Sequence, residues 1–513
     1  MTSETNRRPR LNRAGLIFLS LWVFFLVGAT LYGSWTEPQA QGQIALYQTD
    51  LTLEALEWQP ASIEEPEQLK AQIFGEAPLG DALEQYQKVR ASLLKTYPDL
   101  LSESQEDEAL SLRDRQQRDA LDQLNLKLGI LTAQAQGVEE ADQYWQDIET
   151  APFTSSAHRQ TVETVETLRS VWRSRPVPDA EVLLHDRLAG WFQTQSLSQL
   201  LTQSAETEKL AQLQDEIQVQ AQSAVKRLAI AVGIPLLGSL VGMIVLVTWG
   251  IQLTRQALRR DQSTAPPVDE ASSTPLNLEV SWGLDTFWLT MLLWFLAFFG
   301  VSLVVPLGLQ VVFGRAITES ARGQALLALS NYSGLIAAGL GLIVWMTRPY
   351  LSNFFRWLPI DFKGSWIKWG LGGYVVALPM VLLISVVNQK LLGDQGGGNP
   401  LLDIILRTHD VGTWFVLLFM VSVLAPLFEE TVFRGFALTS LYRYFPLWVA
   451  VTASALLFAI AHLNIADFLP LFCLGCILGT VYARSKNLLA SIMLHSLWNG
   501  AQLVELLYLS GGS

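Results

Sequence analysis

Long apolar stretches alternate with polar connections along most of the chain. A helix that crosses a bilayer needs about 20 consecutive apolar residues, and nine runs reach or approach that length. They lie near 15–33, 228–250, 284–312, 325–346, 369–388, 411–442, 446–465, 467–483 and 487–509. The pattern predicts an all-α, polytopic membrane bundle of about nine transmembrane helices.

Residues 34–227 follow a different pattern. Between 51 and 226, apolar residues recur at three- and four-residue spacing among Leu, Ala, Gln and Glu, as amphipathic helices require. One stretch resembles a tetratricopeptide repeat (TPR) in its spacing, through Leu128, Gly129, Gly137, Ala141, Trp145 and Pro152. No regular period continues, so a soluble α-helical domain is predicted here, either TPR-like or an irregular bundle.

Composition and charge separate the same two regions. The chain has 513 residues, 50% hydrophobic and 16% charged, with a formal net charge of -12. Residues 34–227 hold 16 Lys and Arg against 32 Asp and Glu, whereas the rest hold 19 against 15. An acidic soluble region within a slightly basic membrane protein excludes a nucleic-acid-binding function, which needs a basic face. The two cysteines, Cys473 and Cys476, lie in an apolar run with Gly475 and Gly479, a spacing that favours helix packing rather than redox chemistry.

Positive charges in short loops mark the cytoplasmic side of a membrane protein. Four arginines precede the first run, which we interpret as an uncleaved anchor. With the N-terminus inside, ten of the basic residues in loops face the cytoplasm: Arg255, Arg259, Arg260, Arg348, Arg356, Lys363, Lys368, Arg443, Arg484 and Lys486. This orientation makes residues 34–227 extracytoplasmic.

The expected organisation follows from these observations. It comprises a cytoplasmic tail and anchor (1–33), the acidic domain (34–227), a transmembrane helix with its cytoplasmic end (228–260), a flexible linker rich in Pro, Ser and Thr (261–280), and a membrane bundle (281–513).

Ionisable groups inside the bundle are the candidates for chemistry, since each costs roughly 2.5–3.5 kcal/mol at the bilayer centre. Glu429, Glu430 and Arg434 lie in one apolar segment and must face a protein interior or a wet cavity. Glu430 and Arg434 are four residues apart and can pair on one helical face. Glu429 points about 100° away and is left free for other work.

Two later runs add further polar groups. Phe458 and His462 stand four residues apart near the end of one run, and His495 and Asn499 stand one turn apart on the last. At about 1.5 Å per residue from the predicted cytoplasmic boundaries, Glu430 and these polar groups fall at depths of roughly 14 to 24 Å. Each alone is explained as interhelical hydrogen bonding or a structural tie. Together, at similar depth, they indicate a site.

The three motifs E-E-x-x-x-R, F-x-x-x-H and H-x-x-x-N resemble those of the CPBP intramembrane proteases, the family of type II CAAX prenyl endopeptidases and Abi bacteriocin-processing and immunity proteins. The resemblance covers about 366–510 and implies hydrolysis of a peptide bond within the bilayer. It implies that Glu429, aided by His462, activates water and that His495 and Asn499 stabilise the oxyanion. Glu430 is expected to hold Arg434 or to share the catalytic role, and Arg434 and Phe458 to support the site.

A metal-dependent reaction is the other mechanism that the residues allow. Glu429, His462, His495 and Asn499 could instead bind a divalent metal such as Zn²⁺ and leave a position for water. The sequence leaves the metalloprotease and metal-free mechanisms open.

The expected partners are a membrane-associated peptide or protein substrate, the lipid bilayer and a protein partner for residues 34–227. The alternative function is a non-proteolytic membrane scaffold or immunity factor that holds a partner through the outer domain.

Overall fold

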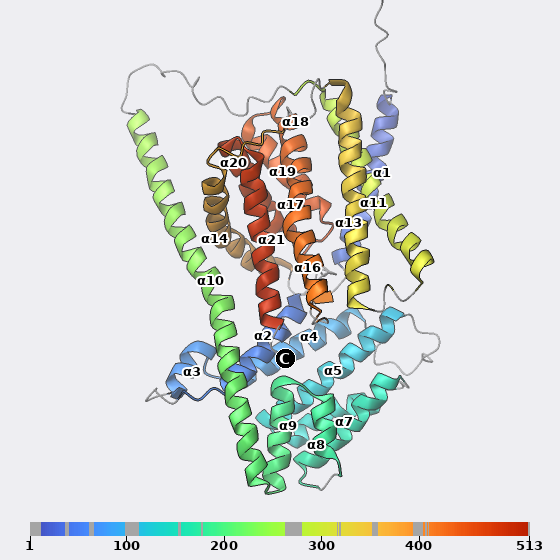
Figure 1. Ribbon diagram of the computed structural model, residues 1–513, viewed down its shortest axis with the longest axis vertical. Coiled ribbons are helices and arrows are strands. Elements are labelled where there is room, and N and C mark those ends of the chain that lie inside the picture. Colours follow the sequence, from blue (N-terminus) through green and yellow to red (C-terminus); the bar gives the residue numbers. More distant parts are fainter. Residues whose placement is uncertain are drawn as a thin grey trace, which may run out of the picture. The chain divides into compact units, whose positions relative to one another are not determined.

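The computed structural model describes most of the chain. The described residues are 12–35, 41–60, 66–97, 112–151, 155–175, 178–261, 280–314, 317, 320–350, 358–392, 404–405, 408 and 410–510. All regular elements in these ranges are helices, which confirms the all-α prediction (Figure 1). Most of the predicted linker, from 262 to 279, lies outside the described residues.

The described chain forms two compact units. Unit 1 consists of residues 1–37 and 235–507, and unit 2 of residues 38–234 and 508–513. Unit 1 thus groups the N-terminal anchor with the membrane bundle, whereas the boundary between the units near residue 234 falls inside the long helix α10 (Thr207–Asp261).

Unit 2 is a set of helices packed around one core. They are α2 (Gln41–Leu56), α3 (Pro66–Phe74), α4 (Pro78–Thr96), α5 (Leu112–Ala135), α6 (Val138–Glu149), α7 (Ser156–Trp172), α8 (Ala180–Arg187), α9 (Gly190–Gln203) and the first part of α10. Amphipathic spacing explains the core, because leucines and aromatics from eight of these helices turn inward together.

Helices α5 and α6 pack closely in unit 2. A Cβ atom on Gly129 would lie 1.9 Å from Nε1 of Trp145, so only glycine lets the indole seat against α5. Trp145 is fully buried, as is Ala141 on the same helix. The small residues and the aromatic therefore pack as the spacing indicates, while a TPR-like array stays a prediction.

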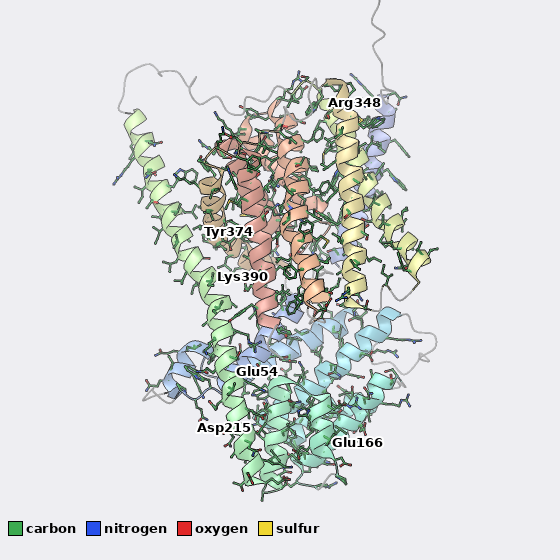
Figure 2. All side chains as sticks on the ribbon, viewed as in Figure 1. Glu54, Glu166, Asp215, Arg348, Tyr374 and Lys390 are labelled. Carbon is green, nitrogen blue, oxygen red and sulfur yellow. The ribbon has the colours of Figure 1, made fainter. Side chains whose placement is uncertain are left out.

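Unit 1 is the membrane bundle. Its further helices are α1 (Arg13–Trp35), α11 (Leu284–Phe313), α13 (Ala321–Thr347), α14 (Trp366–Leu392), α16 (Val411–Phe419), α17 (Ala425–Glu430), α18 (Thr439–Tyr442), α19 (Leu447–Ala461), α20 (Phe468–Ser485) and α21 (Leu488–Ser510). Arg348 directly follows α13, and Lys390 lies in the last turn of α14. The two residues lie toward opposite ends of this unit (Figure 2).

Seven helices in the described ranges are long and apolar enough to cross a membrane. These spans are Arg13–Trp35, Thr207–Gln256, Leu284–Phe313, Ala321–Tyr350, Trp366–Leu392, Val411–Tyr442 and Phe468–Ser485. The two remaining predicted runs are also helical: α19 is a shorter apolar helix, and α21 carries the last run. Helix α19 ends at Ala461, before the predicted run does, because His462 caps it and Leu463 turns the chain with φ of 53°.

Two contacts tie α1 into the bundle. Nε1 of Trp288 on α11 donates to Oγ of Ser20 at 2.9 Å, and the backbone N–H of Ile465 donates to Oγ of Ser34 at 3.2 Å. Val23 and Val27 are buried in the bundle core. The first helix therefore packs as part of unit 1, beside the loop that follows His462.

Helices α19 and α20 pack closely through glycines. A Cβ on Gly475 would lie 2.9 Å from Cβ of Ala455, and one on Gly479 would lie 3.1 Å from Val451. Both cysteines of this helix, Cys473 and Cys476, are free. The geometry agrees with a packing role for the glycine spacing.

Candidate active site

The two acidic residues of the first motif lie where the helix changes its winding. Helix α17 ends at Glu430 and is flanked by two π-helical segments, η6 (Met420–Leu424) and η7 (Thr431–Leu438). A π-helical turn is wider than an α-helical one and occurs frequently at functional sites. The pattern of apolar residues does not reveal these wide turns.

Glu430 and Arg434 form the buried end of the site. Their side chains are fully inaccessible, and Nη1 of Arg434 donates to Oε1 of Glu430 at 2.7 Å. Nη2 of Arg434 donates to the carbonyl of Gly475 at 3.0 Å, and the guanidinium carbon lies 4.5 Å from the ring centroid of Phe458. The arginine thus links helices α17, α19 and α20 at one point.

His495, on α21, bridges the two glutamates. Its Nδ1 lies 2.9 Å from Oε1 of Glu430, and its Nε2 lies 3.8 Å from Oε2 of Glu429. Its side chain is 2% exposed, so the imidazole is held inside the protein.

His462, at the end of α19, approaches the same oxygen from another helix. Its Nε2 lies 3.9 Å from Oε2 of Glu429, and its Nδ1 lies 2.8 Å from the carbonyl oxygen of Phe458. The side chain of His462 is 32% exposed, against 15% for Glu429. The structure therefore brings together Glu429, His462 and His495 from three helices, as the depth argument predicts.

The tautomers of both histidines follow from their Nδ1 partners. A carbonyl oxygen only accepts hydrogen bonds, so Nδ1 of His462 must carry the proton. The Glu430 carboxylate also only accepts, so Nδ1 of His495 carries its proton as well. In the neutral imidazole, each Nε2 is then an acceptor. Both acceptors face Oε2 of Glu429 at distances too long for a direct hydrogen bond but suited to an intervening water.

Oε2 of Glu429 is buried and has no hydrogen-bond partner among the described residues. The other oxygen, Oε1, accepts a hydrogen bond of 2.8 Å from the hydroxyl of Tyr332 on α13. Tyr332 is not among the residues predicted from the sequence, because it stands 97 residues before Glu429 and belongs to no motif. A phenol in an apolar run is the only sequence signal, and it is a weak one.

Phe458 contacts both imidazoles. Its ring meets those of His462 and His495 edge to face, with centroids 4.8 and 5.7 Å apart. This packing explains the phenylalanine of the F-x-x-x-H motif, since the ring fixes the orientation of the histidine one turn later.

Asn499 has a different neighbour. Its Nδ2 donates to the backbone carbonyl of Val421 in η6 at 3.1 Å. Gly500 lets α21 come close there, because a Cβ at this position would lie 3.1 Å from Oγ of Ser422. The contact that the structure gives Asn499 therefore joins α21 to the π-helical segment η6.

The donor types at this site suit a zinc ion, but their spacing is wide. Both histidines present Nε2 while a carbonyl or carboxylate holds Nδ1, the usual arrangement behind a metal ligand. Two bonds of about 2 Å at a tetrahedral angle separate ligand atoms by about 3.4 Å, less than the 3.8 and 3.9 Å from Oε2. In the described part of the chain, no group of three or more His, Cys, Asp and Glu is arranged to hold a metal.

Comparisons with known proteins match the same segment of the chain. Residues 411–501 match the family described as "Type II CAAX prenyl endopeptidase Rce1-like". The chain is 30% identical over 141 residues to the membrane-embedded CAAX protease MroQ of Staphylococcus aureus, covering 26% of this chain and 56% of that protein. It is 22% identical over 219 residues to the putative membrane peptidase YdiL of Bacillus subtilis, covering 42% of this chain and 86% of that protein. No solved structure matches.

The fold defines an integral, helical membrane protein, and its candidate site lies in the segment that matches the membrane-protease family model. More narrowly, residues 411–501 are an Rce1-like domain of the type II CAAX prenyl endopeptidase family. All three motifs lie inside this segment, whereas unit 2, helix α1 and Tyr332 lie outside it.

Proposed function

We propose that this protein is an intramembrane endopeptidase that hydrolyses a peptide bond of a membrane-associated protein or peptide, with Glu429 as the group that activates water. One observation carries the proposal. Oε2 of Glu429 is buried and has no hydrogen-bond partner in the described part of the chain, and it lies 3.9 and 3.8 Å from Nε2 of His462 and His495, enough for one water between them.

In this reaction, Oε2 of Glu429 takes a proton from the water while the water oxygen bonds to the carbonyl carbon of the substrate. The carbonyl electrons move onto its oxygen, which becomes an oxyanion. When the C–N bond breaks, the proton passes to the nitrogen of the leaving amine, and an acid and an amine remain. A positioned carboxylate contributes about 10² to 10⁴-fold to the rate in this way.

The two histidines have separate tasks. His462 is the more exposed and its Nε2 is an acceptor, so it helps to orient the attacking water beside Glu429. His495 is held by Glu430, which stabilises the imidazolium if its Nε2 gains a proton near the oxyanion. Asn499, one turn further along α21, is proposed to stabilise the oxyanion. Its side-chain amide also donates a hydrogen bond to the backbone carbonyl of Val421. Glu430 does not face the water in this scheme, because it is committed to Arg434 and His495.

The substrate is proposed from the family description. A peptide with a prenylated cysteine near its C-terminus is the first substrate to test, since the matched family is described by that activity. The proposed orientation, with residues 34–227 extracytoplasmic, rests on the loop charges alone.

The test compares the purified wild-type protein with Glu429→Ala in liposomes. The probes are a quenched fluorogenic peptide with a farnesylated C-terminal CAAX sequence and the same peptide without the lipid. We expect the wild-type protein to cleave the farnesylated peptide and Glu429→Ala to cleave it at least 100-fold more slowly. Glu505→Ala, which removes another carboxylate of the bundle, is the matched control and should retain activity. Equal cleavage by wild type and Glu429→Ala would overturn the proposal.

A scaffold function remains the second candidate, and one observation in unit 2 favours it. A cleft of about 260 Å³ opens between α2, α3, α4, α5 and α9 and is lined in part by Glu57, Lys70, Leu79 and Trp191. The Glu57 carboxylate is fixed there by Nε1 of Trp191 at 3.0 Å and by Nε2 of Gln195 at 2.7 Å. A preorganised polar group in a cleft with both polar and apolar walls suits a peptide segment of a protein partner.

Crosslinking in native membranes separates the two functions. A photoreactive amino acid replaces Lys70, with Glu166 as the control position elsewhere in unit 2, and the captured proteins are compared between wild type and Glu429→Ala. A partner that is captured equally by both and never cleaved supports the scaffold. A captured protein that wild type cleaves supports the protease.

Metal dependence stays a proposal on the donor chemistry alone. Glu429, His462, His495 and Asn499 would hold the ion, and Zn²⁺ would supply a water of lowered pKa and polarise the carbonyl. The described donors lie further apart than tetrahedral binding requires, so the proposed mechanism uses no metal.

A further inference from the structure

Tyr332 stands out because it touches the reactive carboxylate from outside the matched family segment. Its hydroxyl donates to Oε1 of Glu429 at 2.8 Å. The residue lies on α13, 79 positions before the start of the matched segment at 411. It therefore brings to the site a contact that none of the three motifs contains.

The position of Tyr332 is fixed by direct packing of α13 on α17. A Cβ on Gly339 would lie 2.9 Å from Cζ of Phe428 and 2.8 Å from Nε1 of Trp294, so only glycine permits this approach. Gly339 and Tyr332 are seven residues apart and share one face of α13. The ring of Tyr332 also meets Phe428 edge to face, with centroids 6.0 Å apart. Phe428 directly precedes Glu429, so this packing sets the distance between phenol and carboxylate.

The hydrogen bond makes the two oxygens of Glu429 unequal. Oε1 accepts from the phenol, whereas Oε2 has no hydrogen-bond partner within the described ranges and faces the two Nε2 atoms. Without the phenol, the carboxylate could rotate about its last torsion, which is broad for glutamate. Either oxygen could then turn away from the histidines, and fewer molecules would hold the base in the productive orientation.

We propose that Tyr332 is a positioning residue that locks the Glu429 carboxylate with Oε2 toward His462 and His495. The inference rests on the proposed protease function and adds to it a part supplied by α13. The catalytic segment 411–501 is then incomplete as a catalyst without the helix that precedes it.

The first test is kinetic and uses the full-length protein in liposomes with the farnesylated fluorogenic peptide. Loss of one hydrogen bond to a charged group in the transition state lowers the rate about 10- to 100-fold. We expect Tyr332→Phe to lower kcat by this factor and to leave KM unchanged, because the phenol does not touch substrate. Tyr374→Phe, which removes a hydroxyl from another bundle tyrosine (Figure 2), is the matched control and should keep the wild-type kcat.

The second test needs no substrate. A double-mutant cycle of Tyr332→Phe and Glu429→Ala is followed by thermal unfolding of the purified protein. If the phenol holds the carboxylate, the double variant loses less melting temperature than the two single losses added together. Additive losses would overturn the inference.

The two tests keep the proposals apart. An unchanged kcat in Tyr332→Phe, with Glu429→Ala inactive, overturns the positioning role and leaves the protease function standing. A wild-type protein that does not cleave the peptide counts against the proposed function, while the unfolding cycle still decides whether Tyr332 holds Glu429. A raised KM with unchanged kcat would also contradict the inference, since it would place the phenol against the substrate.

Discussion

Nδ1 of His495 lies 2.9 Å from Oε1 of Glu430, the same oxygen that accepts from Arg434 at 2.7 Å. One carboxylate oxygen therefore neutralises a buried guanidinium and also sets the tautomer of the histidine that faces Glu429. The two neighbouring glutamates differ accordingly: Glu430 holds both Arg434 and His495, whereas Oε2 of Glu429 has no hydrogen-bond partner among the described residues.

This difference predicts opposite phenotypes for two adjacent substitutions. Glu430→Gln leaves Arg434 as an unpaired buried charge, and breaking such a pair costs about 3–5 kcal/mol. We expect a large fall in melting temperature or loss of the folded protein. Glu429→Gln breaks no ion pair with Arg434, so its melting temperature should stay within a few degrees of wild type while cleavage is lost. Differential scanning fluorimetry in detergent measures both, and equal melting temperatures for the two variants would contradict the assignment.

Substitutions of the two histidines should differ in their effects on stability. His462 is partly exposed, so His462→Ala is expected to lower the rate about 100-fold or more with little loss of stability. His495 is buried between Glu430 and Phe458, so His495→Ala removes the rate and destabilises the protein by about 2 kcal/mol or more. Kinetics and thermal unfolding of each variant decide this, and a destabilised His462→Ala beside a stable His495→Ala would reverse our interpretation of the site.

Chelation tests the mechanism. If Glu429 and the histidines activate water directly, incubation with 1,10-phenanthroline followed by its removal should leave cleavage of the farnesylated peptide unchanged. Metal analysis of the active protein should find less than stoichiometric zinc. Loss of activity that is restored by added Zn²⁺, and not by Mg²⁺, would establish the metal-dependent branch instead.

Much of this site can be predicted from the sequence, because ionisable residues inside a membrane cost free energy and are therefore rare. Glu429, Glu430 and Arg434 stand out in an apolar run, and counting residues along each helix suffices to place His462 and His495 at a similar depth. The contact between Tyr332 and Glu429 cannot be predicted from the sequence, since it depends on how α13 packs on α17 and no local sequence pattern indicates that packing. The amide of Asn499 likewise meets Val421 because η6 widens there, a change of winding that apolar periodicity does not report.

Unit 2 is predicted to depend on one glycine. Gly129→Ala places a methyl 1.9 Å from Nε1 of Trp145, and the indole must move out of a fully buried position. Overpacking of this kind costs about 1–3 kcal/mol. Thermal unfolding should therefore show a loss in Gly129→Ala, while Gly80→Ala, on an exposed face of α4, should show none. Equal stability of both variants would show that α5 and α6 are packed more loosely.

Acid should weaken the start of α16. Hydrogen bonds from Arg322 and Thr413 hold the pKa of Asp410 below its ordinary value. A carboxyl with a lowered folded-state pKa contributes stability above its unfolded pKa of about 4 and loses it as the pH falls through the folded pKa. We expect Asp410→Asn to melt a few degrees below wild type at pH 7, with the difference shrinking below pH 4. A difference that is constant with pH would show that the charge of Asp410 is not involved.

The two π-helical segments around α17 have a consequence for comparing this protein with others. Each wide turn accommodates one more residue than an α-helical turn, so η6 and η7 shift the register of everything that follows them in the same helix. A homologue that winds this helix regularly would match it only through a gap of one residue inside a membrane span, a place where alignment procedures rarely open one. Catalytic positions transferred across such a pair would then be off by one, and Glu429 would be exchanged for Glu430.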